Sequence, residues 1–189
     1  MAVPAVLAEA TALEERWRVI HRESLATLRQ VCAQSDAGSV LEPGFLAELP
    51  SIALQGLREA EAWAREEHGA SVARLREQVC AHEVLLEDMY AALRQARADV
   101  AALGQAAAAD RGEHGLGCSP ADRCSALATT LRAYEAELQL KQTSTRSLRL
   151  GMPAAELQAL LVAWELQPQL ESVDAMRAGL AANELLAAS

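Results

Sequence analysis

A run of apolar side chains that recurs at alternating steps of three and four residues limits how this chain can fold. From residue 72 to 107 the positions follow the heptad pattern of a coiled coil, in which helices pair along one apolar seam. The seam consists of Leu75, Val79, His82, Leu86, Met89, Leu93, Ala96, Val100, Leu103 and Ala107. We interpret His82, the one polar member, as a group that fixes the register of pairing. The segment is therefore predicted to be a long helix that needs a partner.

A second heptad pattern follows behind a glycine-rich loop at residues 112–119. Its seam consists of Cys124, Leu127, Leu131, Tyr134, Leu138, Lys141, Thr145 and Leu148. Ser119 and Pro120 look like a helix N-cap followed by proline at the first helical position. Two stripes of similar length joined by a short loop favour an antiparallel hairpin. The sequence leaves open whether the two seams pair within one chain or with another protein.

The segments on either side are also predicted to be helical. Residues 1–50 are predicted to hold an N-terminal helix, with Trp17 on its apolar face, and a connector rich in proline and glycine. Residues 51–151 form the hairpin, whose second arm starts at residue 120, and Gly69 is interpreted as a kink or break in the first arm. Residues 152–189 form a corner in which a short helix at 153–167 and a last helix meet at Pro168.

The composition agrees with these helices, because the chain contains 41 Ala and 29 Leu residues, which lose little side-chain freedom in a helix. We therefore expect an all-α fold: an elongated antiparallel helical hairpin or coiled coil, with an N-terminal helix and a short C-terminal helical corner.

Charge and hydropathy argue against several classes of function. The formal net charge is −9, and no run of Arg or Lys stands clear of acidic neighbours, so we expect no direct binding to nucleic acid. No stretch of about 18 apolar residues exists, and the N-terminus has no signal-peptide pattern. We expect a soluble intracellular protein with reduced cysteines, in which Cys32 and Cys80 pack as small apolar groups.

Chemistry-bearing residues are too few and too poorly spaced to suggest catalysis. His114, Cys118 and Cys124 are only three candidate zinc ligands, and they lack a paired-cysteine knuckle. The stretch GLGCSP has two glycines of a dinucleotide-binding loop but no third glycine and no preceding strand. No Ser-His-Asp or Cys-His arrangement can be assembled. We expect no enzyme activity, no metal and no cofactor.

Two motifs near the C-terminus are more specific than the heptads. The first, Y-x-x-E-L-x-L-K-x-T, is formed by Tyr134, Glu137-Leu138, Leu140-Lys141 and Thr143. The second, L-x-x-x-L-x-x-W-x-x-Q-P-x-x-E-S, is formed by Leu157, Leu161, Trp164, Gln167-Pro168 and Glu171-Ser172. Together, over about forty residues, they resemble the C-terminal part of the cyclin-dependent kinase 2-interacting protein family. The predicted coiled coil and Trp17 agree with that family in layout only.

The resemblance implies a non-enzymatic adaptor in the nucleus and cytoplasm that works in a hetero-oligomer. The partners it implies are a hexameric AAA+ ATPase, a second small helical subunit and a cyclin-dependent kinase. The processes it implies are late ribosome maturation, DNA replication and the turnover of chromatin or replisome proteins during the cell cycle. The chain departs from the family in being rich in Ala and Arg, with a single lysine.

The same motifs supply the expected partner-binding residues, which are Tyr134, Leu138, Lys141, Trp164, Gln167, Pro168, Glu171 and Ser172. They also have a purely structural interpretation. Gln167 and Pro168 turn the chain, Glu171 suits the positive end of the next helix, and Trp164 can lock the corner. The heptads alone equally support a structural coiled-coil subunit of a kinetochore, centrosomal or trafficking assembly. The W-x-x-Q-P-x-x-E-S corner favours the adaptor, because a generic coiled coil does not need it.

Overall fold

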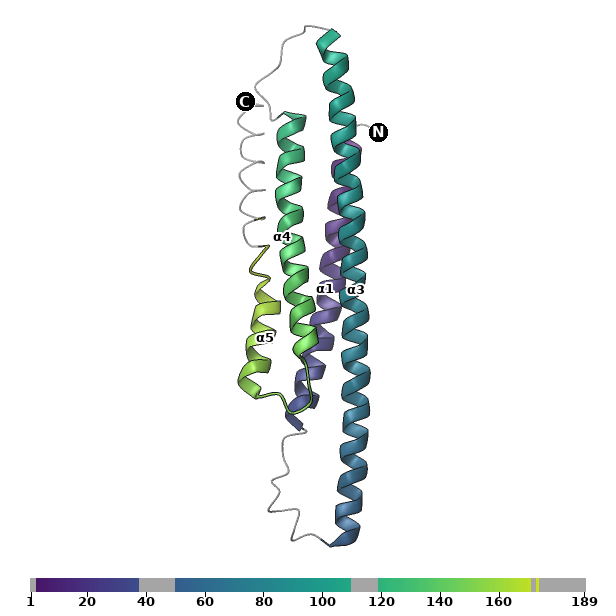
Figure 1. Ribbon diagram of the computed structural model, residues 1–189, viewed down its shortest axis with the longest axis vertical. Coiled ribbons are helices and arrows are strands. Elements are labelled where there is room, and N and C mark those ends of the chain that lie inside the picture. Colours follow the sequence, from purple (N-terminus) through teal and green to yellow (C-terminus); the bar gives the residue numbers. More distant parts are fainter. Residues whose placement is uncertain (1–2, 38–49, 110–118, 171–172, 174–189) are drawn as a thin grey trace. The chain divides into compact units, whose positions relative to one another are not determined.

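The computed structural model describes the backbone of residues 3–37, 50–109, 119–170 and 173, and the side chains of 11–35, 50–102, 119, 121–170 and 173. Within these ranges the chain forms four helices and no strand, which confirms the predicted all-α fold. The helices are α1 (Val3–Ala37), α3 (Ser51–Ala109), α4 (Pro120–Ser147) and α5 (Ala154–Leu166), labelled in Figure 1. Most of the connector and the last predicted helix lie outside the described residues.

The start of α4 follows the local chemistry of its sequence. The Ser119 hydroxyl accepts a hydrogen bond from the Asp122 backbone N–H at 3.2 Å, and the Asp122 carboxylate accepts one from the Ser119 backbone N–H at 3.1 Å. This reciprocal pair satisfies two backbone donors that the helix itself leaves unbonded. The prediction of Ser119 as N-cap and Pro120 as first helical residue is confirmed.

One predicted break is absent. Helix α3 runs from Ser51 to Ala109 without interruption at Gly69. A single glycine costs a helix only about 1 kcal/mol, which the neighbouring helix formers outweigh, so no break occurs here. Trp63 lies on this stretch of α3 with 69% of its surface exposed.

The seam positions of both heptad stripes point inward wherever they are described. In α3 they are buried from Leu75 to Ala96, and Val100 is half-buried. In the second stripe all are buried except Leu127, which is half-buried; the last member, Leu148, directly follows the end of α4. The side chains of Leu103 and Ala107 lie outside the described residues. The period read from the sequence therefore identified the buried face, while the coiled-coil pairing of the two stripes stays a prediction.

Internal packing divides the chain into two compact units, each built from segments of several helices. Unit 1 contains Met1–Val19, His82–Gln139 and Gln167–Ser189, and unit 2 contains Ile20–Ala81 and Leu140–Leu166.

The core of unit 1 is organised around Trp17, whose side chain is completely buried. The ring of His82 on α3 meets it edge-on, with centroids 4.4 Å apart, and the ring of Tyr134 on α4 does the same at 4.8 Å. Edge-to-face contacts of this kind are favourable because the positive edge of one ring meets the negative face of another. A residue of the N-terminal helix thus packs against members of both predicted seams.

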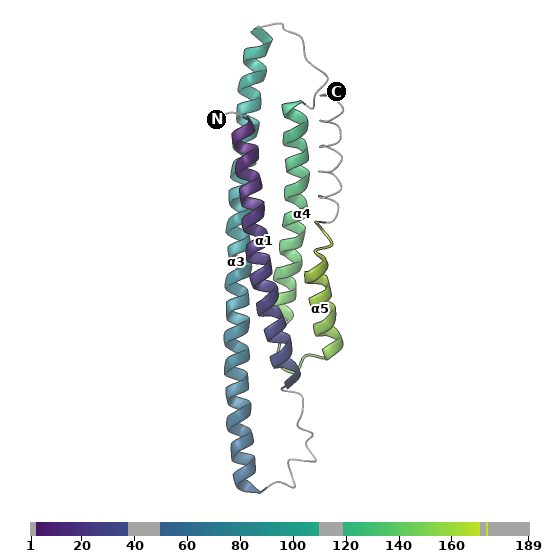
Figure 2. The same ribbon diagram turned by 180° about the vertical axis from the view of Figure 1, so that it is seen from behind.

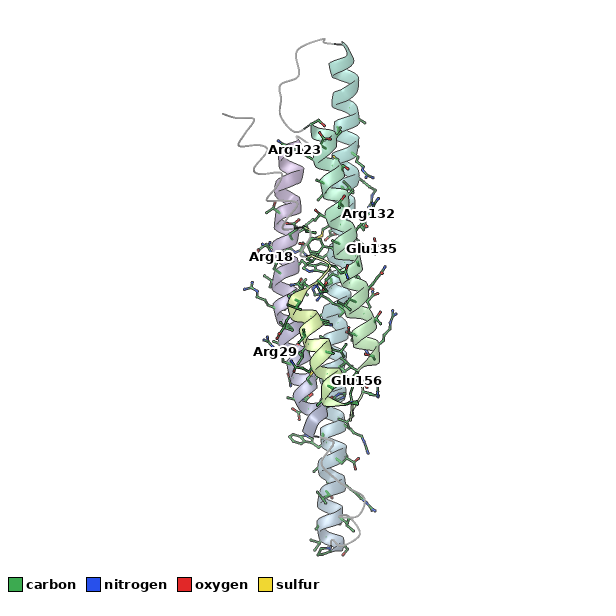
Figure 3. The ribbon with its side chains drawn as sticks, turned by 90° about the vertical axis from the view of Figure 1, so that its left-hand side faces the viewer. Arg18, Arg29, Arg123, Arg132, Glu135 and Glu156 are labelled. Atoms are coloured by element: carbon green, nitrogen blue, oxygen red, sulfur yellow. The ribbon has the colours of Figure 1, made fainter. Side chains whose placement is uncertain are left out.

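At the surface of unit 1, α3 and α4 are joined by a hydrogen bond. The Tyr90 hydroxyl donates to the Glu135 carboxylate at 2.9 Å. Burial raises the pKa of Tyr90, and the nearby Glu135 carboxylate raises it further, while Arg132 lowers it. Figure 3 shows Arg132 and Glu135 on α4.

Candidate functional site

The motif-bearing residues that the structure brings together in unit 2 centre on Trp164. Helix α4 ends at Ser147, and Gly151, with a φ of 74°, turns the chain toward Pro153, whose carbonyl accepts the first hydrogen bonds of α5. Positive φ is readily adopted only by glycine, so this turn depends on the residue found there. Helix α5 then runs back beside the last turns of α4, as Figures 1 and 2 show. This return brings Trp164 next to Lys141.

Lys141 and Trp164 form a cation–π contact inside the protein. The ammonium nitrogen of Lys141 lies 4.4 Å from the centroid of the Trp164 ring, and neither side chain has exposed surface. Taking an ammonium group out of water is costly, and a desolvated cation–π contact returns only about 2 kcal/mol. Further polar contacts are therefore needed to hold Lys141 in place.

His21 on α1 supplies one of these contacts. Its Nδ1 atom lies 3.1 Å from the Lys141 Nζ atom, and the His21 side chain is also buried. This contact gives the buried Lys141 nitrogen a polar partner within hydrogen-bond distance. Lys141, Trp164 and His21, here called the Lys141 cluster, thus join α4, α5 and α1.

Two ion pairs flank the Lys141 cluster at the surface. Arg29 on α1 contacts Glu165 on α5 at 2.7 Å, and Arg149 contacts Glu156 at 3.7 Å. Arg29 and Glu156 are labelled in Figure 3. All four side chains are about half exposed, so each pair contributes only about 0–1 kcal/mol. The buried contacts of the cluster, more than these pairs, determine where α5 lies.

A second buried polar contact lies elsewhere in unit 2. The Ser35 hydroxyl of α1 is 3.0 Å from Nε2 of His68 on α3, and both side chains are buried. Desolvation lowers the pKa of His68 from its usual 6.5, so the neutral ring is favoured in the fold. This contact joins α1 to α3 through a neutral hydroxyl group and a neutral imidazole ring.

The chain turns at Gln167, directly after α5. Gln167 has a φ of 43°, an unusual value for a residue other than glycine, and its carbonyl accepts a hydrogen bond from the Leu170 backbone N–H at 2.8 Å. Pro168 is exposed and Gln167 is half-buried. The predicted turn is therefore present. Glu171 and Ser172 lie outside the described residues.

The structure places the predicted partner-binding residues in two different environments. The side chains of Tyr134, Leu138, Lys141 and Trp164 are at most 6% exposed, so they contact their own chain. Tyr134 belongs to the Trp17 core of unit 1, whereas Lys141 and Trp164 belong to the Lys141 cluster of unit 2. Contact of these residues with a partner stays a prediction.

Sequence reasoning missed His21 and an exposed surface. His21 stands four residues after Trp17, so helical spacing could have placed it on the same buried face. Helix α5 carries exposed apolar side chains on one side, here called the outer face of α5: Ala155, Ala159, Val162 and Leu166. Their spacing of four, three and four residues places them on one side of a helix. Because α5 is apolar on most sides, however, the sequence does not predict which side is covered by the rest of the protein.

Three of the four cysteines lie within the described residues. Cys32 and Cys124 are buried free thiols, and burial raises the pKa of Cys32. Cys80 is exposed, so the prediction that it packs was wrong; it lies next to the α3 seam position Val79 and on the outward side. His114 and Cys118 lie outside the described residues. Among the residues that are described, no group of His, Cys, Asp or Glu could hold a metal ion.

Comparison with models of known protein families gives no match, and comparison with curated protein sequences gives none either. None of the helices within the described ranges is both long and apolar enough to cross a membrane.

Proposed function

We propose that this chain is a non-enzymatic adaptor subunit of a hetero-oligomeric complex of the nucleus and cytoplasm. The complex contains a hexameric AAA+ ATPase and a second small helical protein, is linked to a cyclin-dependent kinase, and acts in ribosome maturation and in replication or chromatin protein turnover. The observation that carries the proposal is the pair of C-terminal motifs, which resemble the cyclin-dependent kinase 2-interacting protein family.

The packing of the motif residues supports an architectural role for them. Lys141 of the first motif and Trp164 of the second are in direct contact, although 23 positions separate them in the chain. A buried lysine is costly, so its use beside a buried tryptophan favours a defined arrangement over maximal stability. In this proposal the two motifs fix α5 in one position, and α5 then presents its outer face to a partner.

The outer face of α5 fits a protein–protein contact. Leu166 is 69% exposed and Val162 is 40% exposed, and with Ala155 and Ala159 they form one continuous side of the helix. An apolar side left open on an otherwise anchored helix favours docking of a partner, because covering it removes apolar surface from water.

Affinity purification of the full chain followed by mass spectrometry tests the proposal. Recovery of an AAA+ ATPase together with a small helical protein is expected. Recovery of kinetochore, centrosomal or tethering subunits in their place would contradict it and would favour the structural coiled-coil alternative.

A matched pair of surface variants tests the role of α5 in the same experiment. Leu166→Arg is expected to reduce recovery of the ATPase at least about tenfold, because it places a charge within an apolar contact. Ile52→Arg is the control, since Ile52 is 85% exposed and lies on α3, away from α5 in the sequence. Both variants should melt like the unsubstituted chain. Equal loss of the ATPase with both would exclude a specific contact at the outer face of α5.

A further inference from the structure

The chain has one lysine, and that lysine is buried. Of its 17 Lys and Arg residues only Lys141 is lysine, which leaves 16 arginines. Lys141 has no exposed surface, although lysine is among the residues least often buried completely. The positive charge of the surface is thus carried by arginine, whose guanidinium group stays protonated and does not serve as an acceptor in acyl-transfer reactions.

The Lys141 cluster covers the only ε-amine of the chain. Access is blocked because the Trp164 ring covers the Nζ atom at 4.4 Å, while His21 Nδ1 lies 3.1 Å away. A nucleophilic amine must be neutral and must reach the acyl carbon.

We propose that acylation of the ε-amine of this chain, including isopeptide attachment of a protein modifier, is confined to states in which unit 2 has opened at the Lys141 cluster. In this step the neutral amine nitrogen attacks the carbonyl carbon of a thioester. A C–N bond forms, the C–S bond breaks, the sulfur leaves as thiolate, and the amine loses a proton to water. Lysine modification would then mark opened copies of the chain and spare closed ones.

Chemical acetylation of the full chain tests this directly. The probe is the water-soluble N-hydroxysuccinimide ester of acetate, applied at neutral pH with and without urea. Cleavage after arginine leaves Lys141 in the peptide of residues 133–146, where mass spectrometry measures its labelling rate. The matched control is Thr143→Lys, which puts an amine at an exposed position of the same helix and the same peptide.

Without urea, Lys141 is expected to label at least about 100-fold more slowly than the amine introduced by Thr143→Lys, and in urea the two rates should agree within about twofold. If Lys141 and the amine introduced by Thr143→Lys were labelled at rates within about threefold of each other without urea, the proposal would be overturned. So would a difference that persists in urea, since it would come from local sequence and not from the fold.

Trp164→Ala provides a second measurement. Removing the ring that covers Nζ is expected to raise the native labelling rate of Lys141 at least about tenfold, whether the variant opens locally or more widely. An unchanged rate would show that Trp164 does not control access to the amine, and the proposal would fail. These rates do not depend on any partner, so the outcome is independent of the proposed function.

Discussion

At the scale of single residues, polar side chains decide much of what this protein buries. His21, Lys141 and His68 occupy positions where a simple helical pattern would place leucine or valine. Each has a buried partner: Lys141 contacts His21 and Trp164, and His68 contacts Ser35. Such contacts add less stability than apolar packing but exclude alternative arrangements of the helices, because a shifted helix would leave the polar groups unsatisfied.

Trp164 is expected to be among the most important side chains for stability. Trp164→Ala should lower the free energy of unfolding by about 3–5 kcal/mol, because it leaves a cavity and removes the ring beside Lys141. Trp63→Ala is the matched control: Trp63 is 69% exposed, so the change should be within about 0.5 kcal/mol. Urea denaturation followed by circular dichroism gives both values. Similar values for the two variants would contradict the buried position of Trp164.

Because Trp164 has no exposed surface, its contribution to partner binding should depend on folding. Pulldown of Trp164→Ala should therefore lose partners only in proportion to the fraction of molecules in which the Lys141 cluster has opened and released α5. Loss of partners from a fully folded variant would instead indicate direct contact by the indole.

His68 gives unit 2 a dependence on pH. Its pKa is lowered in the fold by burial, so the unfolded chain binds a proton more readily than the folded one. Stability is then fully present above 6.5, the usual pKa, and is lost as the pH falls through the lower folded value. His68→Gln should show a smaller loss of melting temperature between neutral and mildly acidic pH. If the melting temperature fell equally with pH in His68→Gln and in the unsubstituted chain, His68 would be excluded as a source of acid sensitivity.

At the scale of elements, glycines have opposite effects according to backbone conformation. Gly69 lies within α3 with open space around the position of a Cβ atom, whereas Gly151 has a φ of 74° in the turn before α5.

Gly69→Ala is expected to raise the free energy of unfolding by about 1 kcal/mol, since alanine is the better helix former. Gly151→Ala should lower it by about 1–2 kcal/mol, because a side chain disfavours positive φ. Thermal melting of the two variants provides the comparison. A destabilising Gly69→Ala would mean that α3 is not continuous at this point.

At the scale of the whole molecule, the pairing of the two heptad stripes is the main prediction that remains. Leu93 and Leu131 are buried seam residues of α3 and α4 and belong to unit 1. In a chain without its native cysteines, Leu93→Cys and Leu131→Cys together should cross-link within a monomer through a short bismaleimide. Cross-links found only between chains would show that the stripes pair between molecules.

Arg94, on the same helix as Leu93, provides a control for this cross-linking experiment. Arg94 is exposed and adjacent to Leu93, so the pair Arg94→Cys and Leu131→Cys should cross-link more slowly. Equal rates for the two pairs would indicate that the reagent reports flexibility and not the buried seam.

The sequence alone determined the helical class, the inward face of α3 and α4, and the cap at Ser119. These depend on residue spacing and on contacts within a few positions, which are local. Only the tertiary structure decided that Trp17 packs against both His82 and Tyr134, that Lys141 lies beneath Trp164, and that the outer side of α5 is open. The physical reason is that periodicity specifies which side of a helix is buried, but not which distant side chains cover it.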